Sequence, residues 1–360
     1  MVVNKAKNKI LNNNRGIFMK KFKIKLFTTI LASGLSLSTQ AADSLNIYAW
    51  AESIKPELIS EFEKETGIDV VIDSYTSNED LLAKLKSGTT NYDLVSPSQH
   101  FVDIMIKEGL LENINANSMP AFEAVDAKWK NQWWDKSSEY SIPFAYGSAG
   151  FTVNRDLYKG PANSWKEFFE PGEALKGKIA VFATPDEVIP AAQLYLGVPF
   201  CSEDSSEMKK VLDLLTKQKE YVAVYSSDNI GSRVGGGEVA IHSWWDGNSL
   251  KARKIDSAPI EYAQPKEGLV GWIDSLVVPK GASNVNNAKK FINWISEKDN
   301  ATAQANYYGH SPAVAIDLSK SIYTQVNSPE LFPTVPVVMA RSCSPKAQKL
   351  VDRVWTSLLE

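Results

Sequence analysis

The sequence is poor in the side chains that bind metals or form cross-links. It has two cysteines and three histidines in 360 residues. The histidines, His100, His242 and His310, lie far apart and lack the short spacings of metal-ligand motifs, so we predict no metal site. The cysteines, Cys201 and Cys343, could form a disulfide that closes a long loop, or they could remain two buried thiols. The sequence leaves both alternatives open.

Motifs of catalysis and of phosphate binding are also missing. The segment Gly147–Gly150 resembles the turn that presents a nucleophilic serine, but it lacks the first glycine at the required spacing. The glycines at 235–237 have neither the GxGxxG nor the Walker spacing. We therefore expect a protein that is not an enzyme and that carries no cofactor. An exported hydrolase is the rival hypothesis, and it would need a nucleophile and a base in one cleft.

Long apolar runs are absent beyond the N-terminal region, and that region predicts export. Residues 1–41 include eight basic residues and no acidic one. From Met19, a basic start is followed by the apolar run Leu26–Leu37 and by small residues up to Ala41, which is the pattern of a signal peptide. The run is shorter than the ~20 residues that span a bilayer. We predict cleavage after Ala41, an upstream extension at residues 1–18, and a location in the periplasm.

An excess of positive charge is absent as well. The chain has 39 basic and 42 acidic residues; without the predicted signal peptide 31 basic and 42 acidic residues remain, a net charge of −11. This balance argues against nucleic acid as a partner and favours cationic partners. The remaining length is enough for two domains of ordinary size.

Short apolar runs alternate with amphipathic helices along the chain. In the first half this alternation predicts a parallel sheet covered by helices. A long extended segment at 141–153 then leads into a second α/β run, so we predict two α/β lobes. The predicted strands are 45–50, 70–72, 92–95, 178–182, 238–244 and 275–279. The predicted helices begin at Pro56, near Leu81 and at Val102, cover 208–215 and 288–295, and end with one that Ser344-Pro345 caps.

Tryptophans and carboxylates recur together at the predicted ends of strands, where open α/β sheets bind ligands. A protonated amine binds carboxylates through charged hydrogen bonds and binds the face of an indole ring. The methylene groups between two amines pack on the same rings. A role in the core is the alternative for any single tryptophan. The neighbourhoods are Trp50 with Glu52, Ser96 and Ser98 with His100, Asp186 with Glu187, Trp244 and Trp245 with Asp246, and Trp272 with Asp274.

Nine short motifs, spread in order over the whole chain after Ala41, resemble those of the periplasmic spermidine/putrescine-binding proteins of ABC importers. Each motif alone is weak, but the ordered set is specific. They are YAWAE at 48–52, FEKETG at 62–67, YTSNE at 75–79, YDLVSPS at 92–98, SIP at 141–143, GEV at 237–239, WDG at 245–247, PKEG at 265–268 and WIDSLVVP at 272–279.

The resemblance implies a two-lobed clamshell with two crossover strands, in which each lobe is a mixed, mostly parallel sheet flanked by helices. Lobe 1 would comprise 42–146 and 272–315, and lobe 2 would comprise 147–271 and 316–360. The ligand would lie between the lobes, which close on it. Within the site, the resemblance assigns Asp274 to an internal amine and Glu187 to a terminal amine. Three tryptophans, Trp50, Trp245 and Trp272, would enclose the aliphatic chain.

Several positions depart from the family pattern. Ala51 replaces a hydroxyl residue and Ser53 an aromatic one, while Thr184 stands where an aspartate is usual. Two histidines replace tyrosines, and each could accept a hydrogen bond from an ammonium group when it is neutral. These histidines are His100 and His310. The usual glutamine near the C-terminal end falls around Cys343. The departures leave the predicted fold unchanged and concern the identity of the ligand.

The sequence thus predicts a periplasmic receptor that binds a polyamine and delivers it to an ABC transporter permease, working as a monomer. One alternative is a polyamine-loaded adaptor that acts on a membrane sensor, as in norspermidine sensing. Another is a family member rebuilt for a different small solute. The predicted ligand-binding residues are Trp50, Glu52, Ser98, His100, Glu187, Trp245, Trp272, Asp274 and His310.

Overall fold

Two long antiparallel strands, β4 (Ser141–Asn154) and β9 (Leu269–Val277), form the middle of the sheet in the computed structural model of the protein. The structure describes residues 43–88 and 91–360. The predicted signal peptide and the extension at residues 1–18 lie outside the described residues. Residues 42–360 belong to one compact unit. Nearly every residue of β4 and β9 is buried, so both faces of these strands are covered.

The remaining strands are β1 (Ser44–Trp50), β2 (Asp69–Tyr75), β3 (Leu94–Val95), β5 (Ile179–Val181), β6 (Val222–Tyr225), β7 (Ile241–Trp245), β8 (Ile260–Tyr262), β10 (Ser311–Pro312) and β11 (Val337–Met339). Within the described ranges they join β4 and β9 in one mixed sheet, whose main order is β2-β1-β3-β9-β4-β7-β5-β6. β1 is parallel to β2 and β3, and β5 is parallel to β6 and β7. Antiparallel pairs with β4 and β9 join the two parallel groups.

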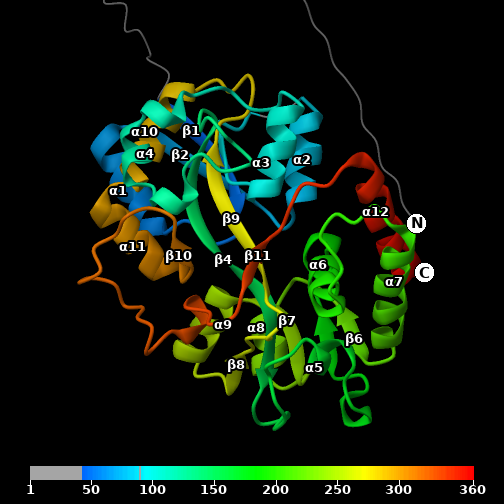
Figure 1. Ribbon diagram of the computed structural model, residues 1–360. Helices are drawn as coiled ribbons and strands as arrows, with labels where there is room; N and C mark the ends of the chain where they lie inside the picture. The colour runs from blue at the N-terminus through cyan, green and yellow to red at the C-terminus, as the bar shows by residue number, and fades with distance from the viewer. Residues whose placement is uncertain (1–42, 89–90) are drawn as a thin grey trace, which may run out of the picture. The chain divides into compact units, whose positions relative to one another are not determined.

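The helices cover both parallel groups (Figure 1). Around β1–β3 lie α1 (Pro56–Thr66), α2 (Asn78–Lys86), α3 (Gln99–Lys107), α4 (Pro120–Ala124), α10 (Val285–Ile295) and α11 (Lys298–Tyr308). Around β5–β7 lie α5 (Lys166–Phe169), α6 (Pro185–Leu196), α7 (Ser205–Lys219), α8 (Ile230–Gly235), α9 (Asp246–Lys254) and α12 (Pro345–Leu359). Short 3₁₀ turns occur at Ala116–Ser118, Ala127–Trp129, Glu173–Leu175 and Pro329–Leu331.

Local sequence signals set the ends of several helices. Pro56 occupies the first turn of α1, and Gly67 ends that helix with a φ of 72°, a conformation that costs glycine little. The side chain of Ser344 accepts a hydrogen bond from the backbone N–H of Ala347 at the start of α12. These predicted helix ends are confirmed.

The predicted strands differ from the observed ones in their bounds. The strand predicted at 92–95 is reduced to β3, and the Asp93 carboxylate before it accepts hydrogen bonds from the backbone N–H groups of Asn46 and Asn284. The strand predicted at 238–244 is β7, which begins at Ile241. The strand predicted at 275–279 begins six residues earlier, at Leu269. Because β9 is buried on both faces, its sequence shows no alternation that would reveal the start. The longer strand carries Trp272 and Asp274 into the middle of the sheet.

The buried apolar side chains form separate clusters for the two parallel groups. One cluster surrounds Phe151, Trp165 and Leu215 and includes side chains from α12. Two further clusters surround β1–β3 and include Phe62 and Met105. The lobe boundaries at 146/147, 271/272 and 315/316 remain a prediction, and the division of the buried residues among these clusters supports it.

Cys201, in the loop after α6, is disulfide-bonded to Cys343, which precedes α12; the two cysteines are 142 residues apart in the sequence. The bond attaches the C-terminal helix to the elements around β5. In the part of the chain that the structure describes, no helix has the length and apolar character needed to cross a membrane.

Candidate ligand-binding site

A cavity of about 220 Å³ lies where β1, β2 and β7 end. Trp50 and Tyr75 are the last residues of β1 and β2, and Trp245 is the last residue of β7. The middle of β9 contributes Trp272 and Asp274, so the cavity wall combines residues from both parallel groups. Its lining also includes Thr76, Ser77, Asn78, Ser98, His100, Thr184, Asp186, Glu187, Ser227, Asp228, Asn248, Tyr308, His310 and Ala340.

The structure brings together all but one of the residues that the sequence predicted for ligand binding. Those in the cavity wall are Trp50, Ser98, His100, Glu187, Trp245, Trp272, Asp274 and His310. Glu52 does not line the cavity. After β1 the backbone turns, with Glu52 in a left-handed conformation at φ 55° and its side chain exposed to solvent. The chain therefore points this carboxylate away from the other residues, and we omit Glu52 from the candidate site.

Asp274 is a buried carboxylate with few partners. Its side chain accepts a hydrogen bond of 2.7 Å from Ser98 Oγ. Ser98 is held in turn by Asn78, whose amide nitrogen donates to Ser98 Oγ and whose amide oxygen accepts from the backbone N–H of Ser98. Desolvation raises the pKa of Asp274 to about 7, against the smaller, opposite effects of Ser98 and the Trp50 indole. A cation placed here would favour the charged carboxylate.

Glu187 provides a second carboxylate, on α6. It accepts hydrogen bonds from Thr184 Oγ1 at 2.8 Å and from the indole N–H of Trp245. Desolvation and the neighbouring Asp186 raise its pKa well above the usual range, although both hydrogen bonds act in the opposite direction. Thr184, the residue that replaces the usual aspartate, thus orients Glu187 instead of contributing a charge.

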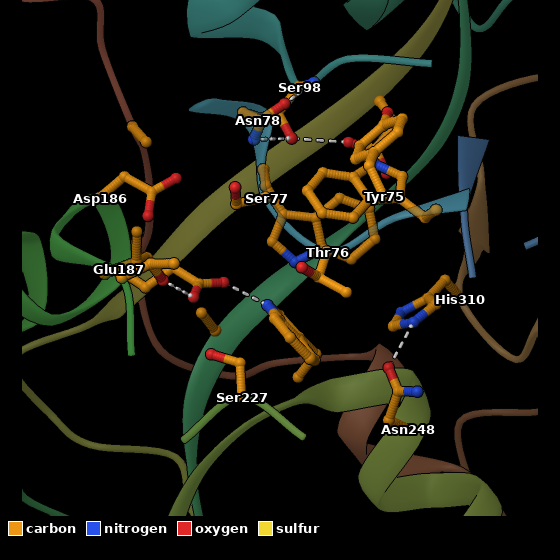
Figure 2. Close-up of a pocket in the computed structure, with 18 of the residues that line it drawn as sticks. Tyr75, Thr76, Ser77, Asn78, Ser98, Asp186, Glu187, Ser227, Asn248 and His310 are labelled. Atoms are coloured by element: carbon orange, nitrogen blue, oxygen red, sulfur yellow. Dashed lines mark hydrogen bonds between the residues drawn. The ribbon is translucent and has the colours of Figure 1, made fainter. Parts of the chain in front are cut away.

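The carboxylates near Glu187 crowd one another. Asp186 lies beside it at the edge of the cavity (Figure 2). Glu79, in the first turn of α2, faces the same pair. Desolvation and repulsion from Asp186 raise the pKa of Glu79 to about 8, although its side chain still reaches solvent. Like charges at short range resist ionising together, so this edge attracts a cation that would relieve the repulsion.

Three half-buried tryptophans supply the apolar part of the wall. Trp50 packs on Tyr75 with ring centres 4.5 Å apart, and Trp245 packs on Phe182 at 4.7 Å. The indole nitrogen of Trp272 is buried without a hydrogen-bond partner among the described residues. A buried indole N–H without an acceptor indicates a place where a ligand or a water molecule would accept its hydrogen bond. The predicted role of these tryptophans as cavity walls therefore agrees with their positions.

His310 lines the cavity, but both of its ring nitrogens are occupied. Nδ1 lies 3.0 Å from Asp246 Oδ1, and Nε2 lies 3.0 Å from Asn248 Oδ1 (Figure 2). Asp246 also accepts hydrogen bonds from the backbone N–H and the hydroxyl of Ser148 and from the backbone N–H of Gly247. The sequence suggested that His310 could accept a hydrogen bond from an ammonium group. In the structure neither of its nitrogens is left to do so, and His310 offers the cavity only its ring.

Sequence reasoning missed several cavity residues. Ser77 and Asn78 follow β2, and Ser227 and Asp228 follow β6, so attention to every strand end would have found them. Tyr75, Thr76, Asn248 and Tyr308 also line the cavity. The last two lie within helices, and only the packing of those helices brings them to the wall.

No cluster of three or more metal-ligating side chains occurs in the described ranges, 43–88 and 91–360. Ser148, the serine of the segment that resembles a nucleophile turn, lies inside β4. Its hydroxyl contacts Asp246 and Tyr262, and no histidine contacts it.

Comparisons with known proteins agree with this arrangement. Residues 57–316 match the family of bacterial extracellular solute-binding proteins. The chain is 32% identical over 302 residues to spermidine/putrescine-binding periplasmic protein 1 of Haemophilus influenzae, with 83% of each chain covered. It is 34% identical over 323 residues to the spermidine/putrescine-binding periplasmic protein of Salmonella typhimurium, with 85% of this chain and 90% of that protein covered.

Among solved structures, the spermidine/putrescine ABC transporter substrate-binding protein PotD of Streptococcus pneumoniae has a TM-score of 0.74 with this chain. The likeness covers 88% of this chain and 99% of that one, at 24% identity. The protein therefore belongs to the family of bacterial extracellular solute-binding proteins and, within it, to the spermidine/putrescine-binding group. The predicted α/β, two-lobed periplasmic-binding-protein fold and the predicted family are confirmed.

Proposed function

We propose that this protein is a periplasmic receptor that binds a polyamine in the cavity and delivers it to an ABC transporter permease. The observation that carries the proposal is Asp274, a desolvated carboxylate with a raised pKa in a wall of tryptophans. An ammonium group is the partner that such a carboxylate lacks. A neutral solute would leave the cost of its burial uncompensated, and an anion would increase that cost.

A second cationic group would bind at Glu187, on the other side of the cavity wall. Its two hydrogen bonds hold the carboxylate in place while leaving it without a counter-charge. Two such carboxylates in one wall with indole rings match a chain of methylene groups that carries two amines. The ligand closes the site by drawing the two groups of strands together through these contacts.

The partners follow from the relatives and from the predicted signal peptide. The Streptococcus relative is described as an ABC transporter substrate-binding protein, and the Haemophilus and Salmonella relatives as periplasmic. We assign the same location and the same kind of membrane partner to this protein. No group in the cavity requires a catalytic role.

A calorimetric titration of the exported protein tests the proposal. The protein is unfolded and refolded with its disulfide intact, which removes any ligand carried through purification. It is then titrated at pH 7.5 with putrescine, cadaverine, spermidine, norspermidine and spermine. We expect a Kd of about 1 μM or tighter for at least one of them, which corresponds to about 8 kcal/mol of binding free energy.

Butylamine is the matched control, because it has one amine and a similar apolar chain. We expect it to bind at least about 100-fold more weakly than the best diamine or triamine. If none of the five polyamines produces binding heat and none raises the melting temperature, the cavity is built for another class of solute and the proposal is wrong.

A further inference from the structure

One histidine in the cavity wall lacks the partners that buried histidines usually have. His100 is the second residue of α3, and only 8% of its surface is exposed. Neither of its ring nitrogens has a hydrogen-bond partner among the described residues. The nearest charged group is the carboxylate of Asp186, with 3.7 Å between Nε2 and Oδ2. Asp186 Oδ1 is also buried without a hydrogen-bond partner.

The other two histidines show that this condition is specific to His100. His310 contacts Asp246 and Asn248 through its two nitrogens. His242 contacts the backbone oxygen of Ser243 and the guanidinium of Arg233. Both are satisfied by the protein alone. His100 is also buried, but it remains at the edge of a cavity, and the one carboxylate opposite lies 3.7 Å away.

The two residues come from different parts of the fold. His100 lies on α3, beside the β1–β3 group, and Asp186 lies on α6, beside the β5–β7 group. Both line the same cavity. The pair therefore connects the two parallel groups at the edge of the site in which we place the ligand. A change in what fills the cavity changes the surroundings of both residues.

The role of the His100–Asp186 pair follows from the carboxylates in the cavity wall and the number of ammonium groups on the ligand. Asp274 and Glu187 provide one carboxylate for each of two ligand ammonium groups. Two further carboxylates line the same wall, Asp186 and Asp228. Asp228 is exposed to solvent, whereas Asp186 is partly buried, lies next to Glu187 and raises the pKa of that residue. A ligand with three ammonium groups could use Asp186 for the third. A ligand with two leaves it to the protein, where His100 is the group that faces it.

We propose that His100 takes the place of a third ligand ammonium by pairing with Asp186, so that the site favours a diamine over a triamine. This inference rests on the proposed function and adds to it the charge of the preferred ligand. A triamine has to draw Asp186 away from His100 and then holds a cation close to the imidazole. A diamine binds with the pair left in place.

The test compares the affinities of putrescine and spermidine in four proteins: the wild type, His100→Gln, Asp186→Asn and the double variant. The full exported chain is titrated calorimetrically at pH 7.5. In His100→Gln we expect the spermidine affinity to rise about tenfold relative to that of putrescine, because Asp186 becomes available to the third ammonium. In Asp186→Asn we expect it to fall about tenfold relative to putrescine. Tenfold changes in the affinity ratio lie in the range expected for two residues in contact.

The double variant distinguishes pairing from independent effects. If His100 acts through Asp186, the double variant has the same ratio of affinities as Asp186→Asn alone. Glu52→Gln is the matched control, since this carboxylate is exposed and outside the cavity, and its ratio should equal that of the wild type. Melting curves of the ligand-free proteins verify that each variant is folded, and His100→Asn replaces His100→Gln if that variant is not.

A ratio that stays within twofold of the wild type in both single variants overturns the inference. If the wild type binds putrescine and the ratio of spermidine to putrescine affinity is unchanged in the variants, the proposed function stands. Only the role of the His100–Asp186 pair is then lost. A wild type that binds neither putrescine nor spermidine overturns this inference, and the proposed function falls with it only if cadaverine, norspermidine and spermine also fail to bind. The two failures are therefore distinguishable in one set of titrations.

Discussion

Two buried aspartates in this protein have nearly the same exposure and different surroundings. Asp246 is 2% exposed and Asp274 is 5% exposed. Asp246 accepts hydrogen bonds from two backbone N–H groups and a hydroxyl, and His310 lies 3.0 Å from it. Asp274 accepts a hydrogen bond from Ser98, with the Trp50 indole nearby. The protein alone supplies the hydrogen-bond partners of Asp246. It leaves Asp274 with few partners, and in this sense Asp274 is the incomplete site.

The difference shows how a structural carboxylate and a binding carboxylate can be told apart. A buried charge that is fully paired stabilises its surroundings, and removal of a partner is costly. A buried charge with few partners reduces the stability of the ligand-free protein and repays that cost when a cation arrives. The raised pKa of Asp274 reflects its desolvation, which its few hydrogen bonds do not offset.

The largest expected effect is on binding at the incomplete site. Asp274→Asn should weaken binding of the best polyamine by at least about 100-fold, because a desolvated ammonium would lose its counter-charge. Calorimetry measures the change, with Glu52→Gln as the control that keeps the wild-type affinity. Wild-type affinity in Asp274→Asn would remove this residue from the site.

The next effect is on stability at the paired site. Asp246→Asn should lower the free energy of unfolding by about 2–4 kcal/mol, because an amide cannot accept from all the donors that converge on this carboxylate. Urea unfolding of the ligand-free protein at pH 7 measures it. Asp256→Asn, an exposed change shortly after α9, is the control and should leave stability nearly unchanged. An equally small effect at Asp246 would contradict its structural role.

A smaller effect of opposite sign is expected when the incomplete site is neutralised. The pKa of Asp274 is about 7 in the folded protein and near 3.9 in an unfolded chain. As pH rises from about 4 to 7, the unfolded chain loses this proton before the folded protein does, so stability falls. Asp274→Asn should therefore raise the free energy of unfolding of the ligand-free protein by about 1–3 kcal/mol at pH 8.

The same substitution should change stability much less at pH 4, where Asp274 is protonated in the folded protein. Urea unfolding at the two pH values measures the difference. A variant that is less stable than the wild type at pH 8 would show that Asp274 is a satisfied structural residue like Asp246.

The smallest effect is the pH dependence of binding. An ammonium group needs the charged form of Asp274, so the proton and the ligand compete. With a pKa of about 7 in the ligand-free protein, affinity should fall about tenfold from pH 8 to pH 6. Calorimetric titrations at these two pH values measure the change, and Asp274→Asn should show a weaker dependence. A constant wild-type affinity over this range would contradict the assigned role of the carboxylate.

Local patterns in the sequence predicted the α/β class, the main strands and half of the described α-helices, but not α6 or α9, which carry cavity residues. The apolar alternation, the prolines at helix starts and the glycine at 67 each act within a few residues, so their consequences can be derived without the rest of the chain. The predictions missed the start of β9, because a strand that is covered on both faces carries no alternating pattern. That start at Leu269 places Trp272 and Asp274 in the cavity.

The candidate site was predicted in part for a similar reason. Trp50, Ser98 and Trp245 lie at or just after strand ends, which a sequence reader can identify, and the family resemblance marked Asp274. The sequence also suggested Glu52, a carboxylate two residues after Trp50. Its left-handed backbone conformation turns it to solvent, and nothing in the residue types indicates that turn.

By itself, the sequence determined the α/β class, the family, the acidic balance and the kinds of side chain available to a ligand, because these depend on residue type and short-range pattern. Only the tertiary structure decided which carboxylates are paired and which are incomplete. Pairing depends on contacts between residues far apart in the chain, such as Asp246 with His310, Ser98 with Asp274, and His100 with Asp186. Burial then determines how strongly each unpaired charge needs a partner, and it is set by the packing of the whole sheet.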